Sequence, residues 1–157
     1  MTAKPRGGAL VMRASSSLPI DRLYLKVRTL KGGVVQLIDP KAVVSREHVL
    51  GAYMDAKRAF AGHTNIANSM AVEMLLFTAM TKQISDAIKA AGAKSGSDFV
   101  LFCSSNAAYL KVKPFLSSHA EFRPSRASAL AAVKRLGIRD TSTEAVLQGM
   151  ALSRLEG

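Results

Sequence analysis

The sequence has no tryptophan, one cysteine and only 11 acidic residues among its 157 positions. Cys103 cannot form an internal disulfide, and its apolar neighbours predict a buried, inert thiol in a reducing compartment. The longest apolar stretch, 70–80, is interrupted by Glu73 and Thr78 and is too short to cross a bilayer. The first 18 residues contain no apolar run of the length that a signal peptide needs. We therefore expect a soluble, cytoplasmic protein.

Signatures of catalysis are also missing. The glycine pairs at 7–8 and 32–33 lack the spacing and the Lys-Ser/Thr pair of a phosphate-binding loop, and there is no G-x-S-x-G nucleophile motif. His48, His63 and His119 are too far apart in the sequence to indicate a zinc site. We expect no metal, no cofactor and no enzymatic activity.

Basic residues are abundant instead: 22 Lys and Arg give a net charge of +11. The excess is uneven, because residues 1–31 carry seven bases against one acid. A surplus of this size attracts polyanions, most often nucleic acid, although a merely solvated surface is the simpler alternative. Residues 1–8 have little to dock and predict a flexible basic N-terminus, followed by a single domain over 9–157.

Apolar patterning predicts a small sheet. Residues 9–39 are interpreted as strands, among them 23–28, where Leu and Val alternate with Tyr, Lys and Arg and predict a half-buried strand with a basic face. Gly32–Gly33 predicts a turn before a strand that ends at Asp39–Pro40. The unbroken apolar run 99–103 predicts a strand in the middle of the sheet.

The remaining segments predict helices. Ser45 and Gly62 bound a helix over 46–61. Asn68 or Ser69 precedes an apolar helix that we expect at the centre of the fold, and Thr81 is expected to cap the next helix, which ends at Gly92. The last third predicts helices over 107–116, interrupted at Pro114, over 126–136, and after a Thr141–Glu144 capping box. The expected fold is α+β: an antiparallel or mixed sheet of three to five strands, covered by about five to seven helices.

Two residues of the central segment are unusual. Glu73 lies among apolar residues, where we expect its carboxylate to accept from backbone N–H groups at the start of a neighbouring helix or to pair with Lys or Arg. Alternatively, Glu73 orients a binding loop over 65–69. Lys82 is expected at a helix start, where it opposes the helix dipole, so a phosphate contact would explain it as well as simple solvation does.

The segment 65–88, NIANSMAVEMLLFTAMTKQISDAI, resembles the small regulatory subunit of the KEOPS (EKC) complex, the PRPK-binding protein family. The matching positions are Asn65, Ile66, Ala67, Glu73, Leu75, Leu76, Lys82, Gln83, Ile84 and Ala87. The resemblance covers roughly residues 33–104. Lys82 stands where the family more often has Arg, and the basic stretch 1–31 is not part of the pattern.

This resemblance implies a non-catalytic subunit that binds a kinase-like ATPase and recruits tRNA through its CCA end, in support of threonylcarbamoyl-adenosine modification. Polar and basic residues are expected to bind the tRNA tail: Asn65, Asn68, Lys82, Gln83, Lys57 and Arg58. An apolar helical face is expected to bind the kinase-like partner: Leu50, Met54, Val146 and Met150. No membrane partner is expected.

Two other functions remain open from the sequence. A general basic RNA- or ribosome-binding module would bind RNA without a kinase-like partner. A small acyl or phosphoryl transferase would use Glu73 as a base and would lose turnover, with its fold retained, in Glu73→Gln.

Overall fold

The computed structural model describes residues 8–155, which form two compact units. Unit 1 comprises the described residues up to Pro40 together with Ala93–Phe122, and unit 2 comprises Lys41–Gly92 together with the described residues from Arg123 onward. The N-terminus predicted to be flexible, residues 1–8, lies outside the described residues except for Gly8. The single domain predicted for 9–157 stays a prediction, since neither unit is a contiguous piece of the sequence.

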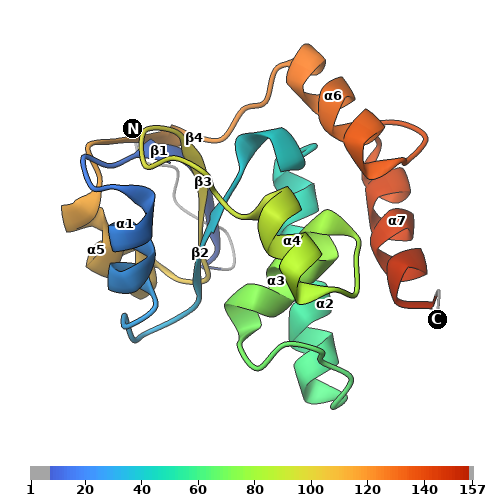
Figure 1. Ribbon diagram of the computed structural model, residues 1–157, viewed down its shortest axis with the longest axis horizontal. Coiled ribbons are helices and arrows are strands. Elements are labelled where there is room, and N and C mark those ends of the chain that lie inside the picture. The colour runs from blue at the N-terminus through green and yellow to red at the C-terminus, as the bar shows by residue number, and fades with distance from the viewer. Residues whose placement is uncertain (1–7, 156–157) are drawn as a thin grey trace. The chain divides into compact units, whose positions relative to one another are not determined.

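Unit 1 is a four-stranded antiparallel sheet with helices on one face (Figure 1). Its strand order is β2-β3-β1-β4. The strands are β1 (Leu10–Ser15), β2 (Val35–Ile38), β3 (Phe99–Cys103) and β4 (Ser118–Glu121). The helices are α1 (Ile20–Val27), α5 (Asn106–Val112) and a short 3-10 helix, η2 (Lys113–Phe115), that contains Pro114. The predicted α+β class and strand count are confirmed.

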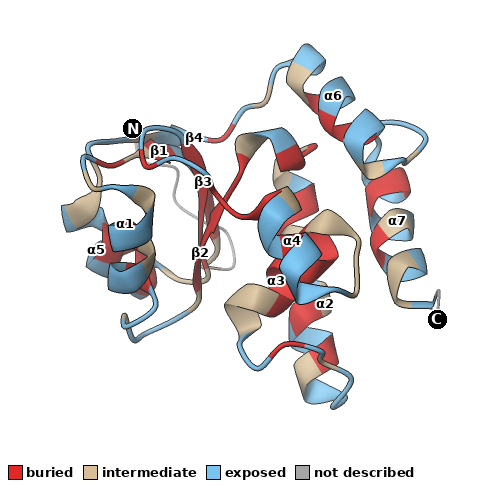
Figure 2. Cartoon of the chain, in the orientation of Figure 1, coloured by how far each residue is buried: buried red, intermediate tan, exposed pale blue. Residues whose placement is uncertain are grey.

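The core of unit 1 lies between one face of the sheet and the two helices. Alternate residues of β1 and β3, such as Met12 and Leu101, pack with Leu23 and Val27 of α1 and with Val112 of α5. Strand β3 is buried along its whole length, as its apolar run predicted (Figure 2). Cys103 lies in this core, and burial raises the pKa of its thiol to about 12.

The strand predicted over 23–28 is wrong, because this segment is helix α1. Leu23 and Val27 are buried one helical turn apart, whereas Leu25 between them is exposed. Three apolar residues at alternate positions are also compatible with a helix, because the first and the third are four residues apart and lie on the same helical face. Asp21 in the first turn and Lys26 in the last turn match the helix dipole.

Unit 2 contains the remaining helices: α2 (Arg46–Ala61), α3 (Met70–Ala79), α4 (Ile84–Ala91), α6 (Arg126–Leu136) and α7 (Thr143–Leu155). A 3-10 helix, η1 (Pro40–Ala42), precedes them. Helix α3 packs against α2, α4 and α7. It is buried from Glu73 to Thr78, as its nearly uniform apolar composition predicted (Figure 2).

Cap residues set most helix starts. The hydroxyls of Ser45, Ser69, Ser105 and Ser125 accept from backbone N–H groups of α2, α3, α5 and α6. Two predicted starts are wrong. The Thr81 hydroxyl accepts from the Gln83 N–H in a turn, so α4 begins only at Ile84 and Lys82 lies before it. At α7, the Ser142 hydroxyl accepts from the Ala145 N–H in place of Thr141.

The chain between α5 and α6 contains strand β4, which the sequence analysis missed. The strand reads Ser-His-Ala-Glu and its residues are exposed or half-buried, so no apolar alternation indicates it. Its register is set by β1, which pairs Met12 with Glu121 and Ser15 with Ser118. Polar residues of this kind are typical of a short edge strand.

Candidate functional site

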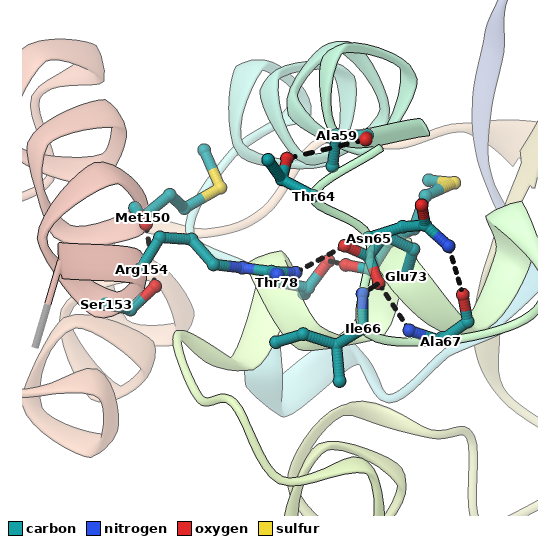
Figure 3. A network of polar contacts seen from close by, with 11 residues as sticks. Ala59, Thr64, Asn65, Ile66, Ala67, Glu73, Thr78, Met150, Ser153 and Arg154 are labelled. Carbon is teal, nitrogen blue, oxygen red and sulfur yellow. Dashed lines mark hydrogen bonds and ion pairs between the residues drawn. The ribbon is translucent and has the colours of Figure 1, made fainter. Parts of the chain in front are cut away.

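The site is organised around Glu73, whose carboxylate is completely buried on the first turn of α3. Its Oε1 accepts from the backbone N–H groups of Ile66 and Ala67, at 3.0 and 2.8 Å. Its Oε2 accepts from Arg154 Nη2 of α7, at 2.6 Å (Figure 3). Both kinds of contact predicted for Glu73 are present, but the backbone donors lie in the loop before its own helix and not at a neighbouring helix start.

Arg154 closes the network from the last turn of α7. Its guanidinium carbon lies 4.1 Å from the centroid of the Phe77 ring, so the cation stacks on an aromatic face while it pairs with Glu73. Its side chain is 19% exposed, and its Nε is buried with no hydrogen-bond partner in the structure. The pair therefore joins α3 to α7 in a partly dehydrated setting, where removal of one partner is costly.

The loop over 64–69 is held along its length. The Thr64 N–H donates to the Ala59 carbonyl at 2.8 Å. The Asn65 side-chain amide donates to the Ala67 carbonyl at 2.9 Å (Figure 3). With Ile66 and Ala67 donating to Glu73, four hydrogen bonds fix the backbone between α2 and α3. The loop presents a defined surface rather than a flexible one.

A pocket of about 540 Å³ opens beside this loop, within unit 2. It is lined by Ala59, Thr64, Ile66, Phe77, Lys82 and Arg154. Its volume falls in the range of small-ligand sites. The lining combines the Lys82 cation, a hydroxyl, an exposed isoleucine and an arginine already paired with Glu73, which suits a ligand with one anionic and one flat apolar part.

The pocket brings together only one of the six residues predicted to bind RNA. Lys82 lines it, half-buried, from the turn between α3 and α4. Asn68 and Gln83 are exposed nearby in sequence but do not line it, and the amide of Asn65 is used within the loop. On α2, Lys57 lies 5.4 Å above the Tyr53 ring and Arg58 pairs with Asp55 at 3.0 Å.

Asp55 of α2 interacts electrostatically with Arg58 and Arg154. Its pKa is raised above the usual range chiefly by burial, and the neighbouring Arg58 and Arg154 oppose that shift. The acidic neighbour thus offsets part of the positive charge of Arg58. Arg58 is less available for phosphate than its 72% exposed side chain alone would indicate.

The four residues predicted to bind the partner divide into two pairs. Met54 is 44% exposed on α2, and Leu50 lies half-buried one turn before it. Val146 and Met150 of α7 are buried, so a direct contact with a partner does not fit their position. The physical reason is the tight packing of α7 on α2 at Gly51, where an added Cβ would lie 3.0 Å from the Met150 methyl. The exposed apolar residues of α7 are Leu147, Leu152 and Leu155.

His48 anchors the start of α2 to the end of α3. Its Nδ1 accepts from the Val44 N–H at 3.0 Å, which leaves the ring proton on Nε2 to donate to the Thr78 carbonyl, also at 3.0 Å. Burial lowers its pKa to about 4, and the Thr78 carbonyl opposes that shift. The imidazole is neutral and structural.

Five lining residues were missed as site residues: Ala59, Thr64, Ile66, Phe77 and Arg154. Ile66 belongs to the segment that carried the family resemblance, but its role was not assigned. Arg154 lies 81 residues from Glu73, and only the need of a buried carboxylate for a cation could have indicated such a residue.

Comparison with known protein families assigns the chain to a family. The family model for the kinase binding protein CGI-121, a subunit family of the KEOPS/EKC complex, matches residues 28–131. The chain belongs to the CGI-121 family. A search of curated proteins finds no match.

The CGI-121 match includes Glu73, Lys82 and the loop over 64–69, and it ends before α7, which supplies Arg154. Within residues 8–155, no group of three or more His, Cys, Asp or Glu side chains could hold a metal ion. None of the helices in the described part is long and apolar enough to cross a membrane.

Proposed function

We propose that this CGI-121 protein is a non-catalytic KEOPS subunit that binds the kinase-like ATPase of the complex and recruits tRNA through its CCA end. In this role it supports threonylcarbamoyl-adenosine modification of tRNA in the cytoplasm. The observation that carries the proposal is the family match over residues 28–131, since the family is one of kinase-binding proteins.

The pocket beside the 64–69 loop is the proposed site for the tRNA tail. A single-stranded tail offers phosphates and unstacked bases, which proteins bind with cations and apolar or aromatic surfaces. Lys82 supplies the positive charge, Arg154 is already paired with Glu73, and the exposed Ile66 supplies an apolar contact for a base. Glu73 acts on this site indirectly, because its carboxylate orients the loop and the guanidinium.

The exposed apolar residues of α2 and α7 are the proposed partner-binding face. Met54 and Leu50 lie one turn apart on α2, and Leu147 of α7 packs close to Gly51 on the same helix. Apolar side chains left exposed on packed helices are typical of an interface for another protein.

The experiment is a pull-down of the kinase-like subunit, combined with titration of tRNA with and without its CCA end. Removal of the CCA end should weaken tRNA binding, and Lys82→Glu should weaken binding of intact tRNA about tenfold or more, because it places a negative charge beside the phosphates. Lys89→Glu on α4 makes the same charge change outside the pocket and should retain tail binding.

Equal affinities of Lys82→Glu and Lys89→Glu for intact tRNA would contradict the pocket assignment. A general RNA- or ribosome-binding module is the second candidate, favoured by the net charge of +11. That module would bind tRNA equally with and without its CCA end and would not retain the kinase-like subunit.

The transferase alternative finds no support in the position of Glu73. Both carboxylate oxygens already accept hydrogen bonds, and the side chain has no exposed surface from which to reach a substrate.

A further inference from the structure

A second basic surface lies on unit 1 and contains none of the pocket residues. It is formed by α1 with the turn after it, and by α5 with η2; we call it the α1–α5 face. Its exposed cations are Arg22, Lys26, Arg28, Lys31, Lys111 and Lys113. Residues 20–31 and 106–115 contain one acid, Asp21.

Two contacts hold the cations of these two segments together. The Lys111 ammonium donates to the Lys31 carbonyl, across 80 positions of sequence. Lys26 Nζ lies 6.0 Å from the centroid of the Phe115 ring, next to Lys113 in η2. These two contacts bring cations of both segments onto one face of unit 1.

The charge of this face is not neutralised by its neighbours. In the described part of the chain, none of the six cations forms an ion pair with a carboxylate. Elsewhere in unit 1, Arg13 is paired with Asp98 at 2.5 Å. Six like charges held close together cost free energy in the absence of a counter-charge, so the face favours a dense polyanion.

The side chains of the face indicate which polyanion. Residues 20–31 expose no aromatic ring and no amide, the groups that stack on or hydrogen-bond to unpaired bases. Residues 106–115 expose one amide, that of Asn106, and the Phe115 ring is half-buried near Lys26. Tyr24 is half-buried and its hydroxyl donates to the Leu37 carbonyl. The six cations therefore outnumber the groups able to read bases, and contacts of cations with phosphates carry no sequence information.

A membrane surface fits this face less well. Helices that bind membranes insert an apolar stripe, whereas α1 buries Leu23 and Val27 in the core of its own unit. Leu25 and Leu110 are exposed, at 58% and 54%, but they are single side chains on separate helices.

We propose that the α1–α5 face binds the phosphate backbone of a nucleic-acid duplex without reading its sequence. The inference goes beyond the proposed tail site and uses none of the pocket residues. Helix α1 also lies outside the stretch that matches the CGI-121 family, so two of the six cations, Arg22 and Lys26, belong to a part of the chain that the family model does not cover.

The test uses a triple variant, Arg22→Gln with Arg28→Gln and Lys113→Gln. A matched control, Lys89→Gln with Arg126→Gln and Lys134→Gln, removes three exposed cations from unit 2. The probes are blunt RNA and DNA duplexes of about 20 base pairs without single-stranded ends, long enough for a backbone-binding surface. Fluorescence anisotropy measures the affinity of the full-length proteins at several salt concentrations.

We expect the triple variant to bind RNA duplex at least tenfold more weakly at low salt, and the slope of log affinity against log salt to fall by about one for each lost phosphate contact. The control should stay within about twofold of wild type in the same titration. Equal binding of the RNA and DNA duplexes would indicate phosphate contacts alone, and stronger binding of RNA would add recognition of the 2′-hydroxyl.

The proposal would be overturned if the wild type bound no duplex, or if the triple variant and the control lost the same amount of duplex affinity. It would also be overturned if the triple variant lost binding to phosphatidylserine vesicles but retained duplex binding. Thermal unfolding of all three proteins establishes that the substitutions leave the fold intact. Lys82→Glu should bind the duplex normally, so failure of the tail site and failure of this face are distinguishable.

Discussion

The ion pair between Glu73 and Arg154 sets the stability of the pocket. Replacement of Glu73 by Gln leaves the guanidinium without its counter-charge and weakens the hydrogen bonds to Ile66 and Ala67. Removal of one partner of a buried pair typically costs 3–5 kcal/mol, so we expect Glu73→Gln to lower the free energy of unfolding by about 3 kcal/mol. Urea unfolding measures this change.

The matched variant is Arg154→Met, alone and combined with Glu73→Gln. Because the two side chains are in contact, their effects should not add, and the double variant should be more stable than the sum of the single losses indicates. Full stability of Glu73→Gln would contradict the structural role, and loss of a turnover at full stability would restore the transferase alternative.

His48 makes the protein sensitive to acid. Its pKa is about 4 in the folded protein and about 6.5 in the unfolded chain, so the unfolded chain binds the proton first as the pH falls. The stability from the neutral imidazole is fully present above pH 6.5 and is lost progressively down to pH 4. We expect a loss of about 3 kcal/mol over this window, measured by urea unfolding at several pH values.

The control for this pH dependence is His48→Gln. Glutamine can accept from Val44 and donate to Thr78, but it does not titrate. This variant should lose less stability than the wild type between pH 6.5 and pH 4. Equal slopes for the two proteins would place the acid sensitivity elsewhere.

Single residues were predictable where one local requirement decided them. A carboxylate in an apolar helix needs partners, which correctly indicated that Glu73 is tied to the backbone and to a cation. The identity of the cation was not predictable, because Arg154 resembles any exposed arginine until α7 packs against α3. The backbone donors from Ile66 and Ala67 depend on a loop conformation that the sequence pattern does not show.

At the scale of elements, helices with caps and long apolar stripes were predicted well. Helix α2 begins and ends where Ser45 and Gly62 indicated, and β3 coincides with its apolar run. Helix α1 was misassigned because eight residues hold too few turns to separate a period of 2 from one of 3.6. Strand β4 was missed because an edge strand needs pairing and not burial.

The exposed Met54 on α2 gives a prediction for the partner. Met54→Glu places a charge at the centre of the proposed face, and we expect it to reduce retention of the kinase-like subunit by at least tenfold, since a buried unpaired charge is strongly unfavourable in an interface. A pull-down over a range of protein concentrations measures the loss. Binding of tRNA should be unchanged.

Leu25→Glu is the control for the partner face. Leu25 is also an exposed apolar residue on a helix, but it belongs to unit 1. Retention of the kinase-like subunit by Leu25→Glu and its loss in Met54→Glu would locate the interface. Retention of the kinase-like subunit by both variants would show that Met54 of α2 does not contact the partner.

At the scale of the molecule, the α+β class followed from counting strands and helices. The strand order did not, because β1 pairs with both β3 and β4, which follow it by more than 80 residues. The division into two units, each of two segments, was equally hidden, since no composition shift or linker marks Pro40, Gly92 or Phe122. Long-range pairing is decided by packing and not by local pattern.

The distance along the chain between Glu73 and Arg154 has a consequence for biosynthesis. The 64–69 loop emerges from the ribosome many residues before α7 does. The Glu73 carboxylate that fixes this loop therefore has no Arg154 to pair with when the loop emerges. At about 5–20 residues per second, translation leaves an interval of several seconds during which burial of the unpaired Glu73 carboxylate would cost free energy. Docking of α7 ends that interval, which makes it the step that completes the pocket.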